Sequence, residues 1–299
     1  MAKQIIECVP NISEGRRPEV VEEIVSVVKA TSGVTLLGCS SDADHNRSVI
    51  TFIGDSEGVK KAAHRLIERA VALINMEEHQ GSHPRIGACD VVPFVPIKGI
   101  TMAECVALAK ALGAKVASGL NLPVYLYGEA ATISERRSLP AIRHGQYEGL
   151  KEAIKHPGRT PDFGPAKVHP TAGAIAIGAR MPLIAFNVNL GTSDVNIAKK
   201  IARVIREAGG GLKNVMAMGV MLEERNVAQV SMNMINYRQT SLYRSYEMVK
   251  MEAKRYGVPV IGSEIVGLTP VDALIDVAEH YLQLEGFSRE QILENHLYE

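Results

Sequence analysis

The chain contains no tryptophan and only five phenylalanines among its 299 residues. Few aromatic platforms are therefore available for stacking on nucleic-acid bases. Neither sign of charge is in excess, because 33 basic residues balance 33 acidic ones. A nucleic acid or a membrane surface is attracted by a net field, and this composition supplies none. We therefore expect small-molecule substrates, and neither nucleic acid nor membrane as a partner.

Long apolar runs and paired cysteines are missing as well. No run reaches the length that spans a membrane, and no apolar signal region precedes Glu7. The four cysteines form no CxxC pair; Cys8, Cys39 and Cys89 lie in apolar, strand-like runs and Cys105 in a predicted helix. Thiols in such places are typically buried and reduced, so we expect a cytoplasmic protein.

The polar segment Met76–Asp90 is the most informative part of the chain, because it holds His79, His83, Pro84 and Arg85. Histidine is the side chain that both takes and gives a proton near neutrality. Pro84 favours an extended backbone at His83, and Arg85 can hold a carboxylate with two parallel hydrogen bonds. The pattern predicts a proton shuttle beside an anion site. A surface loop with incidental histidines is an equal alternative.

The order of apolar and turn-forming segments repeats along the chain. Strands are expected at Gln4–Val9, Val34–Cys39, Ser48–Ile53, Cys89–Pro96, Pro123–Tyr127, Leu183–Leu190, Val215–Met221, Ala228–Met234 and Val258–Ile261. Helices are expected to begin at Pro18, Asp55 or Ser56, Thr101 (through Leu112), Thr192 or Ser193, Gln239 (to Tyr256), Thr269 and Ser288. Both halves read strand–helix–strand–strand–helix–strand, the split βαβ unit. This predicts an α/β (α+β) chain of two ferredoxin-like domains, 1–180 and 181–299. Helices are expected on one face of each sheet, with an active-site cleft between the domains.

Polar residues recur at corresponding places of the two halves. Asn11 and Asn46 flank strands of the first half, and Asn187 and Asn189 end the first strand of the second. They are candidates to line the cleft, although asparagine more commonly serves as a turn residue. The intervening segment Lys155–Gly173 is rich in proline and glycine, and it is either a domain connection or a ligand-binding loop.

A metal site is the main competing interpretation of the histidines. His79 and His83 are four residues apart, a spacing that ligates zinc on a helix, and a second acidic and imidazole cluster occupies residues 42–45. Gly81 and Pro84 argue against a helix there, so we expect no metal. A cysteine nucleophile has less support still, because most of the thiols are predicted to be buried.

Several longer motifs resemble those of the formiminotransferase family, in the order in which that family has them. They run from the N-terminus to about residue 285 and comprise Glu7–Gly15, Asp42–Val49, Gly81–Asp90, Pro93–Pro96, Pro123–Ala131, Asp162–Pro165, Leu183–Leu190 and Ala228–Ser231. The resemblance implies a one-carbon transferase of histidine degradation. Such an enzyme moves the formimino group of N-formimino-L-glutamate to N5 of tetrahydrofolate, its co-substrate, without a metal.

The resemblance also implies individual roles. His83, in the family's HPR motif, would be catalytic, in preference to His79. The folate-binding segment would consist of Gly164, Pro165, Ala166, Lys167, Val168, His169, Pro170, Thr171, Ala172 and Gly173. Candidates for substrate binding are Asn11, Asn46, Arg47, Arg85, Arg180, Asn187 and Asn189.

Two other functions stay open for the chain. One is formimino transfer from glycine, as in purine fermentation, and the other is a ferredoxin-like ligand-binding module without catalysis. The presence of His83 weighs against the second. An open sheet edge would favour a homodimer.

Overall fold

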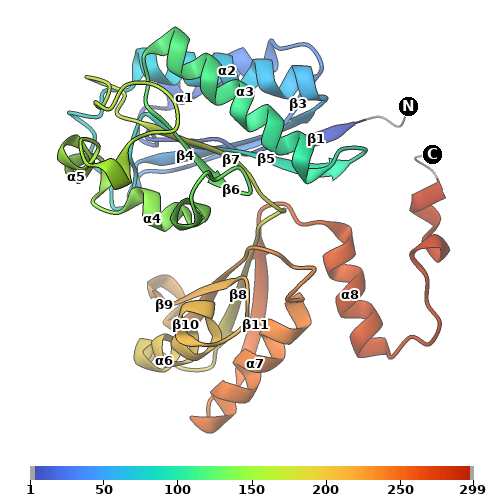
Figure 1. Cartoon of the computed structure of the whole chain (residues 1–299). Coiled ribbons are helices and arrows are strands. Elements are labelled where there is room, and N and C mark those ends of the chain that lie inside the picture. The colour runs from blue at the N-terminus through green and yellow to red at the C-terminus, as the bar shows by residue number, and fades with distance from the viewer. Residues whose placement is uncertain (1–3, 297–299) are drawn as a thin grey trace. The chain divides into compact units, whose positions relative to one another are not determined.

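The computed structural model describes residues 4–296, and the chain divides into two compact units, Met1–Arg180 and Met181–Glu299 (Figure 1). We call them unit 1 and unit 2. Each is built from one β-sheet and the helices packed against it. The predicted mixed α/β class is therefore confirmed.

Unit 1 contains a mixed sheet of seven strands within the described residues. The strands are β1 (Ile5–Cys8), β2 (Asn11–Ile12), β3 (Val34–Asp42), β4 (Arg47–Gly54), β5 (Cys89–Lys98), β6 (Val124–Gly128) and β7 (Ile175–Ala179). Strand β3 pairs with β4, which pairs with β1 and β2; these in turn pair with β5, all antiparallel. Strands β5, β7 and β6 continue the sheet in parallel.

Three long helices cover one face of this sheet: α1 (Pro18–Lys29), α2 (Ser56–Leu73) and α3 (Met102–Leu120) (Figure 1). Their starts follow local signals, since the Asp55 carboxylate accepts a hydrogen bond from the Gly58 N–H group and Thr101 forms the predicted capping box with Glu104. Helix α3 runs eight residues beyond its predicted end at Leu112. Its apolar face continues through the buried Val116. The helix ends at Asn121, whose backbone adopts the left-handed conformation.

The opposite face of the unit 1 sheet is also partly covered. Short helices α4 (Leu139–Arg143) and α5 (Gln146–Ala153) contribute Ile142 and Leu150 to a second apolar cluster with Tyr125 and Tyr127 of β6. The expectation that helices pack on a single face is therefore wrong for unit 1. The tyrosines alternate with residues that face α3, so the strands are apolar on both sides.

The Pro/Gly-rich segment before residue 173 is a folded part of unit 1, so its interpretation as a plain linker is wrong. The Phe163 carbonyl accepts from the Val124 N–H group at 2.9 Å, and the Asp162 carboxylate accepts from the Leu126 N–H group at 2.8 Å. The segment then enters β7, a strand that the sequence did not predict. Short 3₁₀ turns η1 (Ser134–Arg137) and η2 (Pro157–Arg159) complete the unit.

Unit 2 has an antiparallel sheet in the order β11-β8-β10-β9. Its elements are β8 (Ile184–Leu190), α6 (Val195–Ile205), β9 (Val215–Leu222), β10 (Val227–Met234), α7 (Leu242–Arg255), β11 (Val260–Val266) and α8 (Val271–Leu282), with 3₁₀ turns η3 (Glu207–Gly209), η4 (Glu223–Arg225), η5 (Arg289–Gln291) and η6 (Leu293–His296). The predicted strand–helix–strand–strand–helix–strand order is observed over β8 to β11. Alternate residues of β8, among them Phe186 and Val188, join the core with α6 and α7, so the intervening asparagines point to the other face.

Candidate active site

Two loops of unit 1 pack closely against each other. The turn of residues 42–46 joins β3 to β4, and the loop of residues 79–85 precedes β5. Gly81 lies at their contact, where a Cβ atom would stand 2.2 Å from the His45 carbonyl oxygen. A side chain at this position would push the loops apart, so the glycine in the middle of the predicted site is a requirement of the packing.

These loops and β2 line a small pocket. The lining residues are Ile12, Ser13, His45, Asn46, Arg47, His79, His83, Arg85 and Asp90. The pocket thus unites His83 with three of the predicted binding residues. All of them come from unit 1.

Both ring nitrogens of His79 are engaged. Nε2 lies 2.9 Å from the Asn46 carbonyl oxygen, and Nδ1 accepts a hydrogen bond from Nε of Arg85 at 3.1 Å. These contacts assign the hydrogen to Nε2 and a neutral ring. Burial lowers the pKa of His79, in agreement with that state. A proton shuttle needs a nitrogen that can change partner, and His79 has none to spare.

His83 is half-buried and has a different environment. Its ring meets the His45 ring edge-on, with the centroids 5.8 Å apart. Burial lowers the pKa of His83 to about 3, and the positive charges of Arg47 and Arg143 act in the same direction. A hydrogen bond with the Pro84 backbone opposes the shift. The imidazole is therefore neutral at pH 7 and able to accept a proton.

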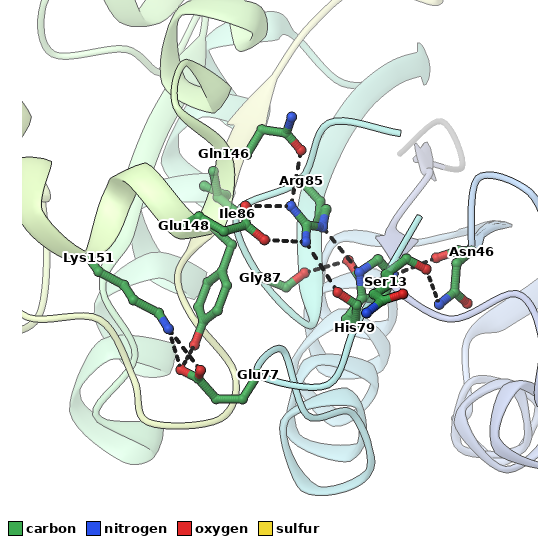
Figure 2. A network of polar contacts seen from close by, with 12 residues as sticks. Ser13, Asn46, Glu77, His79, Arg85, Ile86, Gly87, Gln146, Glu148 and Lys151 are labelled. Atoms are coloured by element: carbon green, nitrogen blue, oxygen red, sulfur yellow. Dashed lines mark hydrogen bonds and ion pairs between the residues drawn. The ribbon is translucent and has the colours of Figure 1, made fainter. Parts of the chain in front are cut away.

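Arg85 is buried, and all five of its N–H groups have an acceptor (Figure 2). Its Nη atoms hold the Glu148 carboxylate at 2.6 and 2.9 Å, and Nη1 also donates to Oε1 of Gln146 at 3.0 Å. The remaining donors meet Nδ1 and the carbonyl oxygen of His79. No N–H group is left for a substrate carboxylate, so the predicted clamp serves instead to fasten the 79–85 loop to α5.

Arg47, unlike Arg85, has N–H groups that are not occupied by protein acceptors in the described residues. Its Nε donates to Oδ1 of Asn11 at 2.9 Å, while Nδ2 of Asn11 donates to the Val9 carbonyl oxygen. Within residues 4–296 the Arg47 guanidinium forms no ion pair, and its Nη groups have no hydrogen-bond acceptor. Asn11 therefore orients Arg47, and Arg47 presents the free end of its guanidinium.

Arg143 of α4 is a second guanidinium whose charge acts on His83; it is not itself a lining residue of the pocket, and sequence reasoning did not find it. Its Nε donates to Oδ2 of Asp90 at 2.9 Å, and Nη2 donates to the same oxygen. Oδ1 of Asp90 accepts from the Ile86 N–H group at 2.7 Å. The Asp90 carboxylate thus ties α4 to the start of β5. Burial and the charge of Arg143 lower the pKa of Arg47, which shows that the two guanidiniums influence each other.

The side chain of Asn46 is used inside the protein. Its Oδ1 accepts from the Gly15 N–H group at 2.9 Å, and its Nδ2 donates to the Gln80 carbonyl oxygen at 2.9 Å. Its backbone is left-handed, with φ at 48°. The turn role that is common for asparagine accounts for these contacts. Asn46 shapes the pocket by joining both loops.

The predicted folate segment, residues 164–173, has an anchored end and an exposed middle. Its buried end is joined to the residue directly before β5, since the Ala172 carbonyl oxygen accepts from the Ala88 N–H group at 2.9 Å. Nδ1 of His169 accepts from the N–H groups of Thr171 and Ala172 and so closes a turn. Gly173 is buried in the same place. The members exposed to solvent are Gly164, Ala166, Lys167, Pro170 and Thr171.

Comparison with known proteins decides the family. Residues 5–180 match the N-terminal subdomain of the formiminotransferase domain, and residues 185–296 match the formiminotransferase domain that follows it. The chain belongs to the formiminotransferase family.

Named relatives of this formiminotransferase-family chain are similar over nearly its whole length. It is 54% identical to a glutamate formimidoyltransferase of Streptococcus pyogenes serotype M1, over 99% of either chain. It is 51% identical to a glutamate formimidoyltransferase of Thermoplasma acidophilum, over 97% of this chain and 96% of the relative. A formimidoyltransferase-cyclodeaminase of Rattus norvegicus is 46% identical over 94% of this chain, which matches 53% of that longer protein.

The predicted site residues Asn187 and Asn189 of this formiminotransferase chain lie on β8 of unit 2. Nδ2 of Asn187 donates to Oε1 of Glu264 at 3.1 Å, and Oδ1 of Asn189 accepts from Nε2 of Gln229 at 2.8 Å. Gln229 also donates to Glu264, and these bonds together with Arg225 lower the pKa of that carboxyl despite its slight burial. Gln229 and Glu264 were missed in the sequence, although both occupy register positions beside the asparagines.

Arg180 follows β7 and is not among the residues that line the pocket of His83. Its backbone N–H group donates to the Phe94 carbonyl oxygen at 3.1 Å. Its charge acts on Glu7 and Tyr127: burial raises the pKa of both groups, and Arg180 opposes the shift. The structure therefore places this predicted binding residue with β1 and β6, away from the pocket lining.

The expectation that the cysteine thiols are buried holds at three positions and is wrong at Cys39. Cys8, Cys89 and Cys105 are buried, and burial raises the pKa of each thiol. Cys39 is exposed, because β3 is the edge strand of its sheet. In the described part of the chain no group of three or more His, Cys, Asp or Glu side chains is placed to hold a metal. Over the same residues, every helix is too short or too polar to cross a membrane.

Proposed function

We propose that this chain is a glutamate formimidoyltransferase, which transfers the formimino group of N-formimino-L-glutamate to N5 of tetrahydrofolate. The observation that carries the proposal is the neutral His83 imidazole in a pocket with the unpaired Arg47. A base without charge beside a free guanidinium suits an acidic substrate whose reaction moves a proton. The names of the relatives at 51% and 54% identity support the same activity.

Arg47 is the group that we assign to a donor carboxylate. Its Nη groups are free, and Asn11 fixes the direction of its guanidinium. Arg85 is assigned to positioning, because its five N–H groups are already engaged. A carboxylate at Arg47 also changes His83. The bound negative charge cancels part of the field that lowers the pKa of His83, so the imidazole becomes more basic when the donor arrives.

The reaction needs one group that accepts a proton and returns it. The N5 lone pair of tetrahydrofolate attacks the formimino carbon and forms a carbon–nitrogen bond. His83 takes the N5 proton as the tetrahedral intermediate forms. The bond from that carbon to the glutamate nitrogen then breaks, and His83 gives its proton to the leaving nitrogen. The products are 5-formiminotetrahydrofolate and L-glutamate, with no net change in protons and no metal or prosthetic group involved.

The exposed residues of the folate segment are the part that we assign to the co-substrate. Lys167 is exposed and offers a cation for the carboxylates of the folate tail. The anchored end of the segment is hydrogen-bonded to Ala88, three residues beyond Arg85 and directly before β5. The folate segment and the His83 loop are thus mechanically joined within unit 1. His169 is assigned to shaping the turn, because its Nδ1 is occupied by two backbone N–H groups.

We also propose that the protein is a cytoplasmic homodimer. Its buried thiols suit a reducing compartment. Within residues 4–296, strand β3 pairs on one side alone, with β4, and Leu37 and Cys39 are exposed on it. Light scattering behind a sizing column is expected to give twice the mass of one chain. A monomer at micromolar concentration would contradict the dimer.

The activity is tested with purified protein, tetrahydrofolate and either N-formimino-L-glutamate or N-formiminoglycine. Absorbance reports the formation of 5-formiminotetrahydrofolate. We expect rapid transfer from the glutamate donor and slow transfer from the glycine donor, unchanged by exhaustive dialysis against a chelator. No transfer from either donor would refute the proposed function. Activity that is lost on dialysis and restored by zinc would reinstate the metal site.

A further inference from the structure

We propose that Arg143, held by Asp90, receives the side-chain carboxylate of the donor and thereby restricts the enzyme to dicarboxylic donors. The inference rests on the proposed function and adds a second carboxylate receptor to it. Three observations support it: the way Asp90 holds Arg143, the charge balance of the pocket, and the relation of both guanidiniums to the pocket that contains His83.

Asp90 occupies only one edge of the Arg143 guanidinium. Nε and Nη2 of Arg143 both donate to Oδ2 of Asp90. The other edge, formed by Nη1 and the second N–H of Nη2, has no acceptor among residues 4–296. That edge has the fork geometry that matches a carboxylate with two hydrogen bonds. The side chain of Arg143 is mostly buried, with 13% of its surface exposed, so its direction is fixed.

The charges around His83 leave room for an anion. Arg85 is neutralised by Glu148, and Arg143 is neutralised by Asp90. Arg47 has no such partner in the described chain. One positive charge therefore remains for the first carboxylate of a donor, and the half-occupied guanidinium of Arg143 is available for the second. Burying like charges together is unfavourable, and an anionic ligand relieves that cost.

The donor has two carboxylates at different distances from its reacting carbon. The α-carboxylate is attached next to the nitrogen that leaves, and the side-chain carboxylate lies two methylene groups further along. Arg47 lines the pocket together with His83, whereas Arg143 is joined to the pocket through the lining residue Asp90. Arg47 therefore suits the near carboxylate, which a glycine donor shares. Arg143 suits the far carboxylate, which a glycine donor lacks.

The test compares N-formimino-L-glutamate with N-formimino-L-glutamine, a donor of the same length whose far end carries no charge. We expect the wild-type protein to favour the glutamate donor in kcat/KM by about tenfold or more, as for a charge-assisted contact. The R143Q variant should raise KM for the glutamate donor and bring the ratio of the two donors close to one. Because the charge of Arg143 also lowers the pKa of His83, the readout is the ratio of the two donors and not kcat/KM for either donor alone.

Two further variants distinguish donor binding by Arg143 from a purely structural role of the Asp90–Arg143 ion pair. The D90N/R143Q variant removes both charges at once and avoids a buried, unpaired Asp90, so it keeps the test open if R143Q does not fold. R137Q removes an arginine whose partner, Glu129, lies on the surface, and it should leave the donor ratio unchanged.

Equal losses for both donors in the folded variants, or a donor ratio that the variants leave as in wild type, would overturn the inference. A wild-type ratio near one would overturn it too. Failure of the proposed function is distinct, since wild-type protein would then transfer from neither donor.

Discussion

Nε of Arg85 donates to Nδ1 of His79 at 3.1 Å, and this contact gives the two histidines of the HPR region different roles. His79 receives a hydrogen bond on one nitrogen and meets the Asn46 carbonyl oxygen with the other. It is therefore part of the scaffold that holds Arg85. His83, four residues further along, is the imidazole to which we assign the proton transfer.

The scaffold role of Arg85 predicts a loss of stability when it is removed. Arg85→Ala would leave Glu148, Gln146 and His79 without their shared donor, and Arg85 is only 6% exposed. We expect the free energy of unfolding to fall by about 3 kcal/mol, as for the loss of one partner of a buried pair. Urea denaturation measures it.

Glu148→Gln provides the matched comparison for that prediction. The Glu148 side chain is 63% exposed, and the other acceptors of Arg85 remain in this variant. A loss of about 1 kcal/mol or less is expected. Equal losses in both variants would show that the exposed carboxylate, and not the buried guanidinium, holds the loop.

The contact of the two loops at Gly81 predicts a second effect. A methyl group in Gly81→Ala would meet the His45 carbonyl oxygen at 2.2 Å and displace the 79–85 loop. We expect turnover to fall by tenfold or more in a protein that still folds, because a displacement of about 1 Å can cost about a hundredfold in rate. Gly119→Ala is the control, since a methyl group there meets no atom within 4 Å in helix α3. Normal turnover in Gly81→Ala would contradict the packing argument.

The charge state of His83 can be observed directly. Burial and the two guanidiniums lower its pKa to about 3 in the free protein. L-glutamate, the product, should raise that pKa because its carboxylates offset the charges of Arg47 and Arg143. A proton NMR titration of the imidazole, assigned by comparison with His83→Gln, measures both values. An ordinary pKa near 6.5 in the free protein would show that the pocket does not act on this ring.

The same shift makes stability depend on pH in a defined window. Between pH 6.5 and about 3 the unfolded chain protonates at residue 83 and the folded chain does not, so acidification favours unfolding. His83→Gln removes this contribution and should lose less stability than wild type between pH 7 and pH 5. His144→Gln, at an exposed position, is the control.

Local signals made the secondary structure largely predictable. The capping box of Thr101 and Glu104 and that of Ser288 and Gln291 are present, because each involves residues three apart. Strand β7 was not predicted. Its short run of small residues forms a strand only because β5 and β6 lie on either side of it, and that pairing depends on contacts distant in sequence.

The candidate site was also predictable only in part, because some of its contacts join residues that are distant in the sequence. The resemblance pointed to the 79–85 loop and Arg47, which line one pocket. The partners of these residues come from far along the chain: Glu148 is 63 residues from Arg85, and Arg143 is 53 residues from Asp90. No local pattern marks them. From the sequence alone, Arg85 is predicted to be free to bind a substrate carboxylate. In the structure its guanidinium is already hydrogen-bonded to Glu148.

The exposed position of Lys167 predicts an effect on the folate tail alone. Lys167→Ala should weaken the binding of polyglutamylated tetrahydrofolate about fivefold, with a smaller difference at high salt, because an exposed ion pair is partly screened. The turnover number should be unchanged, since the tail takes no part in the chemistry. An unchanged Michaelis constant for the polyglutamylated co-substrate would remove Lys167 from the site.

In the proposed mechanism, His83 carries the proton in formimino transfer. The most direct measurement compares kcat for wild type, His83→Ala and His79→Ala, together with the dissociation constant of each protein for tetrahydrofolate. We predict that His83→Ala lowers kcat by about a hundredfold or more with folate binding nearly unchanged, whereas His79→Ala lowers it far less. Equal losses of kcat in the two variants, or normal turnover in His83→Ala, would contradict the role of His83 as the proton carrier.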